Sequence, residues 1–221
     1  MGGLVLKPRL CVPLLILLLL SPLIEGCTGS VQGTVVDNST GKPISGTRVK
    51  VADSTATTDK DGRFTLGEVP TGKQLLMLTA TDYEAAKRRV TVKGGSNIVK
   101  VRLDKTLAAS YRAFFAAYKV ARYEEMYQFM HPDYRQRTSF EEFKAIWSEG
   151  GGSEPVRLVL GKSTLLEQWH VPDTNRRYES VQEVRRTIIW REPGAADMPE
   201  EGVQYWKKVD NTWYVLFPTN P

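Results

Sequence analysis

Cysteine is scarce in this sequence of 221 residues, which holds only Cys11 and Cys27. Cys11 lies inside an apolar run near the N-terminus, so removal of that run would leave Cys27 as the sole cysteine. One cysteine excludes an intramolecular disulfide and any metal site built from several thiolates. We therefore expect no cysteine-based metal site, and the role of Cys27 becomes the first question.

A strong net charge is also missing. The chain has 30 Lys and Arg against 25 Asp and Glu, a formal net charge of +5, which falls to about +4 without residues 1–26. A nucleic-acid-binding protein usually gathers its positive charge into a patch. Here Lys and Arg alternate with apolar residues, as in "TRVKV" and "IVKVRL". We interpret these residues as solvated faces of strands and expect no nucleic-acid partner.

No apolar segment is long enough for an ordinary membrane-spanning helix. The run Leu10–Ile24 is apolar apart from Ser21, and it is shorter than the roughly 20 residues that a span needs. Lys7 and Arg9 precede it. A positive region followed by a short apolar region is typical of a cleaved export leader.

The end of this leader, "IEGC", resembles the lipobox of bacterial lipoproteins. Ile24 and Gly26 match the aliphatic and small residues before the cysteine, whereas Glu25 departs from the uncharged residue usual between them. The resemblance implies that Cys27 receives a lipid and that residues 1–26 are removed. It predicts a lipidated N-terminus and short linker over residues 27–30, and a lipid anchor in the cell envelope outside the cytoplasm. The alternative is an ordinary secretory leader that leaves Cys27 as a free thiol.

Residues 31–105 alternate apolar and polar side chains in short segments separated by turn formers. The segments are "VQGTVVD", "TRVKVA", "RFTLGEV", "QLLMLTA", "KRRVTV" and "NIVKVRL". About seven short strands with frequent turns predict an all-β sandwich.

Four motifs in this region resemble the carboxypeptidase regulatory-like domain, a transthyretin-like (prealbumin-like) sandwich. They are G-x-V-x-D from residue 33, G-x-P-x-x-G from 41, D-G-x-F from 61 and V-P-x-G from 69. The family's usual Gly-Tyr is replaced by Asp82-Tyr83. The resemblance implies a typically non-catalytic folding or spacing module whose fold overlaps with carbohydrate-binding domains.

Two features of this sandwich bear on ligand binding. Asp59 and Asp61 in "DKDG" suggest a calcium loop, but a third ligand is absent, so we predict a turn in which Gly62 takes a positive φ. Sugar-binding modules often stack sugars on exposed aromatic rings. Only Phe64 and Tyr83 are aromatic here, and the alternation points Phe64 toward the core.

The pattern changes at residue 106. Leu107, Tyr111, Phe114 or Phe115, and Tyr118 recur at helical spacing and predict a buried aromatic stripe. We expect Pro132 to end this helical region. A further helix is predicted over "TSFEEFKAIWSE", with Thr138 or Ser139 as its N-cap and Glu141 or Glu142 completing a capping box.

The rest of residues 106–221 has strand periodicity. "VRLVLGKSTLL", "RYESVQEVRRTIIWRE", "VQYWKKV" and "TWYVLF" predict four antiparallel strands, with "EPGAADMPEEG" as a polar loop and a tight turn at Asp210-Asn211. The pattern "Y…Y…Y…M.P.YR…S..EF…W" with a closing "W.Y" resembles the cone-shaped domain named after nuclear transport factor 2, including its SnoaL-like and lumazine-binding-like lipoprotein variants. That resemblance implies an α+β cone, in which a curved antiparallel sheet wraps a helix and leaves an apolar pocket at its mouth.

The candidate pocket residues of this second domain are Tyr118, His131, Asp133, Trp147 and His170. His131 with Asp133, or His170 with Asp173, would suit acid–base chemistry, although the favoured role for these residues is to satisfy helix ends and turns at the surface. No phosphate-binding loop, H-E-x-x-H or dinucleotide motif and no nucleophile-elbow motif is present, so we expect neither a cofactor nor a metal.

Together these features predict a non-catalytic, membrane-anchored lipoprotein with two domains. The sandwich would act as a spacer, and the cone domain would bind an envelope protein, a glycan or a small ligand. The alternatives are a cone domain with weak hydrolase or isomerase chemistry from His131, Asp133 or His170, or glycan binding through the sandwich.

Overall fold

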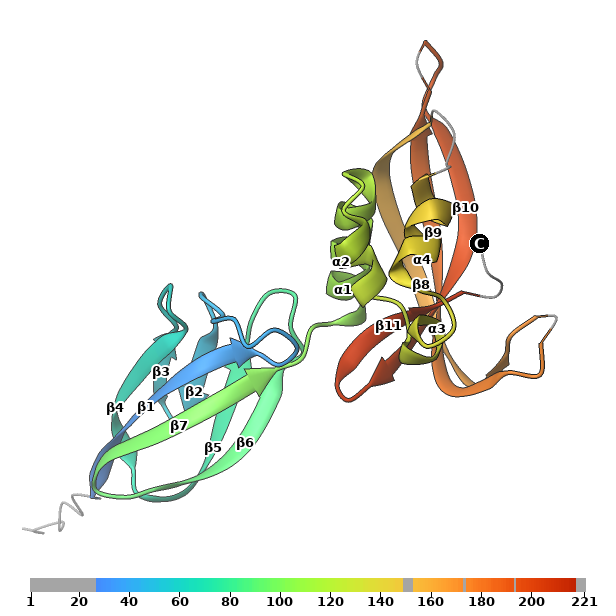
Figure 1. Ribbon diagram of the computed structural model, residues 1–221. Helices are drawn as coiled ribbons and strands as arrows, with labels where there is room; N and C mark the ends of the chain where they lie inside the picture. The colour runs from blue at the N-terminus through green and yellow to red at the C-terminus, as the bar shows by residue number, and fades with distance from the viewer. Residues whose placement is uncertain (1–26, 149–152, 173, 193, 218–221) are drawn as a thin grey trace, which may run out of the picture.

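The computed structural model describes residues 27–148, 153–172, 174–192 and 194–217. The expected leader, residues 1–26, lies outside this part of the chain. Most described residues are in strands, which form three sheets, with four helices in the C-terminal half (Figure 1). Within the described ranges, no helix is long and apolar enough to cross a membrane.

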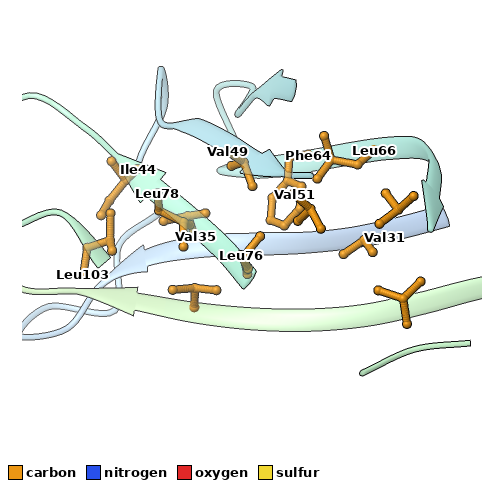
Figure 2. Packing of buried hydrophobic residues seen from close by; sticks show 13 residues of the cluster. Val31, Val35, Ile44, Val49, Val51, Phe64, Leu66, Leu76, Leu78 and Leu103 are labelled. Atoms are coloured by element: carbon orange, nitrogen blue, oxygen red, sulfur yellow. The ribbon is translucent and has the colours of Figure 1, made fainter. Parts of the chain in front are cut away.

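The N-terminal part is a sandwich of two sheets with strand orders β4-β1-β7 and β3-β2-β5-β6. Its strands are β1 (Thr28–Asp37), β2 (Arg48–Val51), β3 (Ser54–Thr57), β4 (Arg63–Pro70), β5 (Gly72–Thr79), β6 (Ala86–Val92) and β7 (Gly95–Leu103). All pairs are antiparallel except β1 with β7. Every second side chain points inward, and Figure 2 shows how Val, Leu, Ile and Phe side chains from both sheets fill the space between them.

Two parts of the sandwich differ from the sequence expectation. Residues 28–30, expected to be a linker, belong to β1, where Thr28 pairs with Pro70 and Gly29 with Gly95. The backbone N–H of Thr71 also donates to the Cys27 carbonyl at 3.0 Å. Strand β3 was not predicted, because its sequence "STAT" carries no large apolar residue and is ordered by pairing with β2.

The C-terminal half is a four-stranded antiparallel sheet of order β11-β10-β9-β8, with helices packed against one face. Its elements are α1 (Leu107–Lys119), α2 (Tyr123–Gln128), α3 (Pro132–Arg135), α4 (Phe140–Ser148), β8 (Glu154–His170), β9 (Arg177–Arg191), β10 (Met198–Val209) and β11 (Thr212–Leu216). Tyr111 and Phe114 of α1 pack on the buried Trp206 of β10, with ring centroids 5.0 and 6.1 Å away. This aromatic contact joins the helical layer to the sheet.

The helical region departs from expectation at Pro132. This residue begins α3 instead of ending a helix, since a proline at the first helical position lacks only an N–H that would be unpaired anyway. His131 is the N-cap, and its Nδ1 accepts the Asp133 N–H at 3.2 Å. The helical region before it is divided into two helices: α1 ends at Lys119, Ala121 has φ +50°, and α2 follows over Tyr123–Gln128.

Other local expectations are confirmed. Ser139 Oγ accepts the Glu142 N–H, and the Glu142 carboxylate accepts the Ser139 N–H at 2.7 Å, which together form the capping box. Asp210 and Asn211 both have positive φ in the β10–β11 turn. The predicted polar loop is shorter than expected, because β10 already begins at Met198.

The sandwich and the C-terminal half meet through polar contacts. Lys208 on β10 donates to both carboxylate oxygens of Glu84 at 2.9 Å and lies 3.5 Å from Asp104. Arg112 on α1 pairs with Asp82. The connection itself is short, since β7 ends at Leu103 and α1 begins at Leu107.

Candidate ligand-binding site

A pocket of about 560 Å³ lies where the ends of α1 and α4 meet the sheet of the C-terminal half. It is lined by Tyr118, Trp147, Ser153, Pro155, Trp190, Met198, Pro199 and Glu200. These residues come from α1, α4, the segment that opens β8, the end of β9 and the start of β10.

Strand register brings the sheet side of the pocket together. Trp190 of β9 lies opposite Met198 of β10 and opposite Pro155 of β8. Glu200 lies opposite Ile188, two residues before Trp190. Paired residues share a face of an antiparallel sheet, so all of these side chains lie on the face that carries the helices.

Three aromatic rings form the walls of the pocket. The Tyr118 ring lies 5.3 Å from that of Trp147 and 6.1 Å from that of Trp190, both nearly perpendicular to it. Edge-to-face contacts of this kind stabilise rings beyond the area they bury. The walls are therefore preorganised before any ligand enters.

Glu200 provides the carboxylate at the pocket. One oxygen accepts from Arg186 Nη1 and the other from Trp190 Nε1, each at 2.8 Å. Both partners hold the carboxylate in one orientation, and charge-assisted hydrogen bonds are stronger than neutral ones. Because a carboxylate has about four acceptor positions, Glu200 can still accept hydrogen bonds from a ligand.

Arg186 lies behind Glu200 in a space that a glycine leaves open. It sits opposite Gly202, where an added Cβ would come within 3.3 Å of the guanidinium. Its side chain is only 16% exposed. The hydroxyl of Tyr111 is buried nearby, and burial raises its pKa to about 12 while the Arg186 charge opposes the shift.

Two polar groups belong to the aromatic side chains that line the pocket. Trp147 Nε1 is buried without a hydrogen-bond partner among the described residues. Burial, and secondarily the Glu200 charge, raises the pKa of Tyr118, which keeps its hydroxyl protonated. The pocket thus combines aromatic walls, the neutral hydroxyl of Tyr118 and one fixed carboxylate.

The structure separates the predicted site residues into two groups. Tyr118 and Trp147 line the pocket, whereas His131, Asp133 and His170 do not. His170 is exposed at the end of β8, and its predicted partner, Asp173, lies outside the described residues.

His131 has the helix-capping role that the sequence favoured, but it is buried instead of lying at the surface. Its ring packs against Tyr178 and Tyr214, with centroids 5.0 and 6.2 Å away. The carboxylate of Asp133 is 3.7 Å from Nδ1. Burial lowers the pKa of this histidine, and the positive charges of Lys207, Arg135 and Arg137 lower it further. The negative charge of Asp133 acts in the opposite direction.

Sequence reasoning missed Arg186, Trp190, Met198 and Glu200 as site residues. A usable signal was present, because a hairpin centred near Gly194 places Trp190 opposite Met198 and brings Glu200 next to them. The polar composition of this segment predicts a loop, and a loop would leave Met198 and Glu200 without strand partners.

Comparison with known families identifies the N-terminal part. Residues 30–106 match the family model of the carboxypeptidase regulatory-like domain. This part of the chain is a carboxypeptidase regulatory-like domain. Among curated proteins, none matches the chain.

The motifs of the carboxypeptidase regulatory-like domain have structural roles here. Asp37 is buried, and burial raises its pKa, but hydrogen bonds from the Thr40 N–H and the Tyr83 hydroxyl outweigh this and leave the pKa below its usual value. Asp82 occupies the position where the family usually has glycine, and its φ is +69°. Glycine adopts a positive φ more readily than other residues, which explains the family's preference. The Tyr83 hydroxyl is engaged with Asp37 at 2.9 Å, and Phe64 is in the core, as predicted.

The "DKDG" segment of this domain is a turn. Asp59 Oδ1 accepts the N–H groups of Asp61 and Arg63 at 2.9 and 2.8 Å. Gly62 has φ +70°, as predicted. Within the described residues, no group of His, Cys, Asp and Glu is arranged to hold a metal ion.

Solved structures similar to this chain include three bacterial proteins. A cohesin–X-dockerin complex from Acetivibrio cellulolyticus matches at 21% identity and TM-score 0.31, over 35% of this chain and only 58% of that one. A Bacteroides uniformis protein provisionally named as carbohydrate-binding matches at 9% identity and TM-score 0.32, over 81% and 99% of the two chains. A Bacteroides fragilis protein of unknown function, provisionally named as membrane-associated, matches at 13% identity and TM-score 0.30, over 85% and 93%. At such low identities and TM-scores these likenesses support no conclusion about function.

Proposed function

We propose that this protein is a non-catalytic binding module of the cell envelope, lipid-anchored at Cys27, in which the carboxypeptidase regulatory-like domain is the spacer and the C-terminal half binds a small ligand. The pocket of Tyr118, Trp147, Trp190 and Glu200 carries this proposal. Its ligand has an apolar ring or compact alkyl group next to a cationic or hydrogen-bond-donating group.

The chemistry of the pocket supports binding more than catalysis. Glu200 is held by an arginine and an indole N–H, so its carboxylate is fixed in place as a hydrogen-bond acceptor. A positive group over aromatic faces gains about 0.5–2 kcal/mol from the ring quadrupoles. His131, the buried histidine considered as a base, caps α3 and lies among tyrosines away from the pocket lining.

Ligand binding can be tested by tryptophan fluorescence, since two pocket residues are tryptophans. Benzylammonium and benzoate form a probe pair of matched shape and opposite charge. We expect saturable quenching by benzylammonium, with weaker binding of benzoate, and loss of this preference in Glu200→Gln. No saturable response to either probe would contradict the pocket assignment. Hydrolysis of 4-nitrophenyl acetate that disappears in His131→Asn would instead support the catalytic alternative.

The anchor is tested separately by intact mass and detergent partitioning after expression in a bacterial host. We expect the wild-type chain to gain an acyl-glyceryl mass and to enter the detergent phase, and Cys27→Ser to do neither. If both forms stay unmodified and aqueous, Glu25 prevents lipobox processing and the anchored part of the proposal fails.

A further inference from the structure

The four strands of one sheet of the sandwich, β2, β3, β5 and β6, carry no acidic residue. Inward-pointing residues such as Val49, Val51 and Leu76 are completely buried. The alternate positions therefore point outward, and we name their five basic side chains the basic face: Arg48, Lys50, Lys73, Lys87 and Arg89.

Cross-strand pairing places these side chains in adjoining rows. Lys50 lies opposite Met77, which lies opposite Lys87. Leu75 lies opposite Arg89 in the next row on the same face. Leu75 is 43% exposed, so an apolar side chain projects between the positive charges.

The charge of the basic face is not neutralised within the protein. None of its five members takes part in an ion pair in the described part of the chain. The net charge of the chain is also unevenly divided: residues 31–105 carry 13 basic and 8 acidic side chains, and residues 106–221 carry 15 and 16. The sandwich thus carries all of the excess of basic over acidic side chains. The sequence alone indicated only that these basic side chains lie on solvated strand faces.

The basic face begins beside Cys27. Thr71 donates its N–H to the Cys27 carbonyl, and Lys73, two residues later, is the member of the basic face at that end of β5. No flexible linker separates Cys27 from the sandwich, because β1 begins at Thr28. In Figure 1, β1 starts at the end of the sandwich far from the C-terminal half.

We propose that the basic face of the sandwich rests on an anionic lipid membrane. Lys and Arg side chains on a sheet face can meet lipid phosphates in one plane, and Leu75 can enter the interface between headgroups. The exposed leucine favours a lipid surface over a soluble anion. The proposal takes its location from the proposed anchor at Cys27, but the binding itself does not need the lipid.

Vesicle co-sedimentation tests the proposal with residues 27–221 carrying Cys27→Ser. We expect the protein to bind vesicles of phosphatidylcholine mixed with phosphatidylglycerol and to bind vesicles of phosphatidylcholine alone only slightly. Binding to the mixed vesicles should weaken as added salt shortens the Debye length to about 8 Å. Each basic residue near an anionic surface contributes about fivefold in affinity. Lys50→Gln with Lys87→Gln should therefore lower the partition coefficient about 25-fold.

A matched pair of lysines provides the control. Lys144→Gln with Lys162→Gln makes the same change in net charge on exposed residues of the C-terminal half and should leave partitioning nearly unchanged. Leu75→Ser should weaken binding without changing its salt dependence, since it removes no charge.

Three results would overturn the proposal. Equal losses in the two double variants would show attraction to net charge alone. Binding to soluble polyphosphate but not to vesicles would assign the face to a soluble anion, and no binding at all would leave it as a solvated surface. Acylation at Cys27 and probe binding in the pocket are measured independently, so failure here is distinct from failure of the proposed function.

Discussion

Mild acid should destabilise the C-terminal half through a single buried histidine. His131 Nδ1 accepts the Asp133 N–H, so the proton of the neutral ring resides on Nε2. Protonating Nδ1 would remove this helix cap and place a positive charge between Tyr178 and Tyr214. Burial accordingly lowers the pKa of His131 from its ordinary value of 6.5, against the opposing carboxylate of Asp133.

The sign of the effect follows from this lowered pKa. Below pH 6.5 the unfolded chain takes up a proton that the folded protein does not. The contribution of His131 to stability is therefore complete above pH 6.5 and is lost as pH falls through the lowered folded-state value. Within that window the free energy of unfolding should fall by up to about 1.4 kcal/mol per pH unit.

Urea unfolding followed by tryptophan fluorescence measures this effect, because all five tryptophans lie in the C-terminal half. His131→Asn retains a capping acceptor but cannot titrate, so its stability should change little between about pH 7 and the onset of carboxylate protonation near pH 5. The only other histidine, His170, is exposed, and His170→Asn should keep the wild-type slope. The reasoning is refuted if His131→Asn retains the slope or if His170→Asn loses it.

Three further perturbations test other parts of the structure. Gly62→Ala should lower the free energy of unfolding by about 2 kcal/mol or more in thermal unfolding, because the residue has φ +70° and a Cβ would lie 2.5 Å from a backbone oxygen. The control is Gly41→Ala, where φ is +69° but the surrounding space is open, and it should lower the free energy of unfolding by only about 1 kcal/mol. Equal costs would show that the clash is relieved. Glu200→Gln should lower stability by about 1 kcal/mol in urea unfolding, since it leaves the mostly buried Arg186 without its counter-charge; a variant as stable as wild type would contradict this. Ser139→Ala should cost about 1 kcal/mol by removing the N-cap of α4, and retention of full helicity and stability by circular dichroism would count against that role.

The elements of this fold that depend on neighbours in sequence could be predicted. Period-two alternation identified most strands of the sandwich, and the Ser139–Glu142 capping box and the Asp210-Asn211 turn follow from short-range chemistry. Local rules were ambiguous at Pro132, because proline both ends one helix and is favoured at the first position of another. The structure has it at the start of α3.

The candidate site was less accessible from sequence, since long-range pairing builds it. Tyr118 and Trp147 were found as helix-borne aromatics, but Arg186 and Glu200 meet only because β9 and β10 pair in one register. The basic face has the same origin. Its lysines and arginines are scattered through the sequence, and only the order β3-β2-β5-β6 brings them together.

The parallel pairing of β1 with β7 has a mechanical consequence. Nine residue pairs, from Gly29–Gly95 to Asp37–Leu103, join the strand that begins at Cys27 to the strand that leads to the C-terminal half. A force applied between Cys27 and the C-terminal half acts along both strands in opposite directions, so it loads this ladder in shear and strains many backbone hydrogen bonds together. Single-molecule pulling between residues 27 and 107 should require a higher rupture force than pulling between residues 27 and 93, which peels the ladder from one end. Similar forces in both geometries would contradict this expectation. A tethered protein built in this way would transmit tension from its anchor to its pocket without extending.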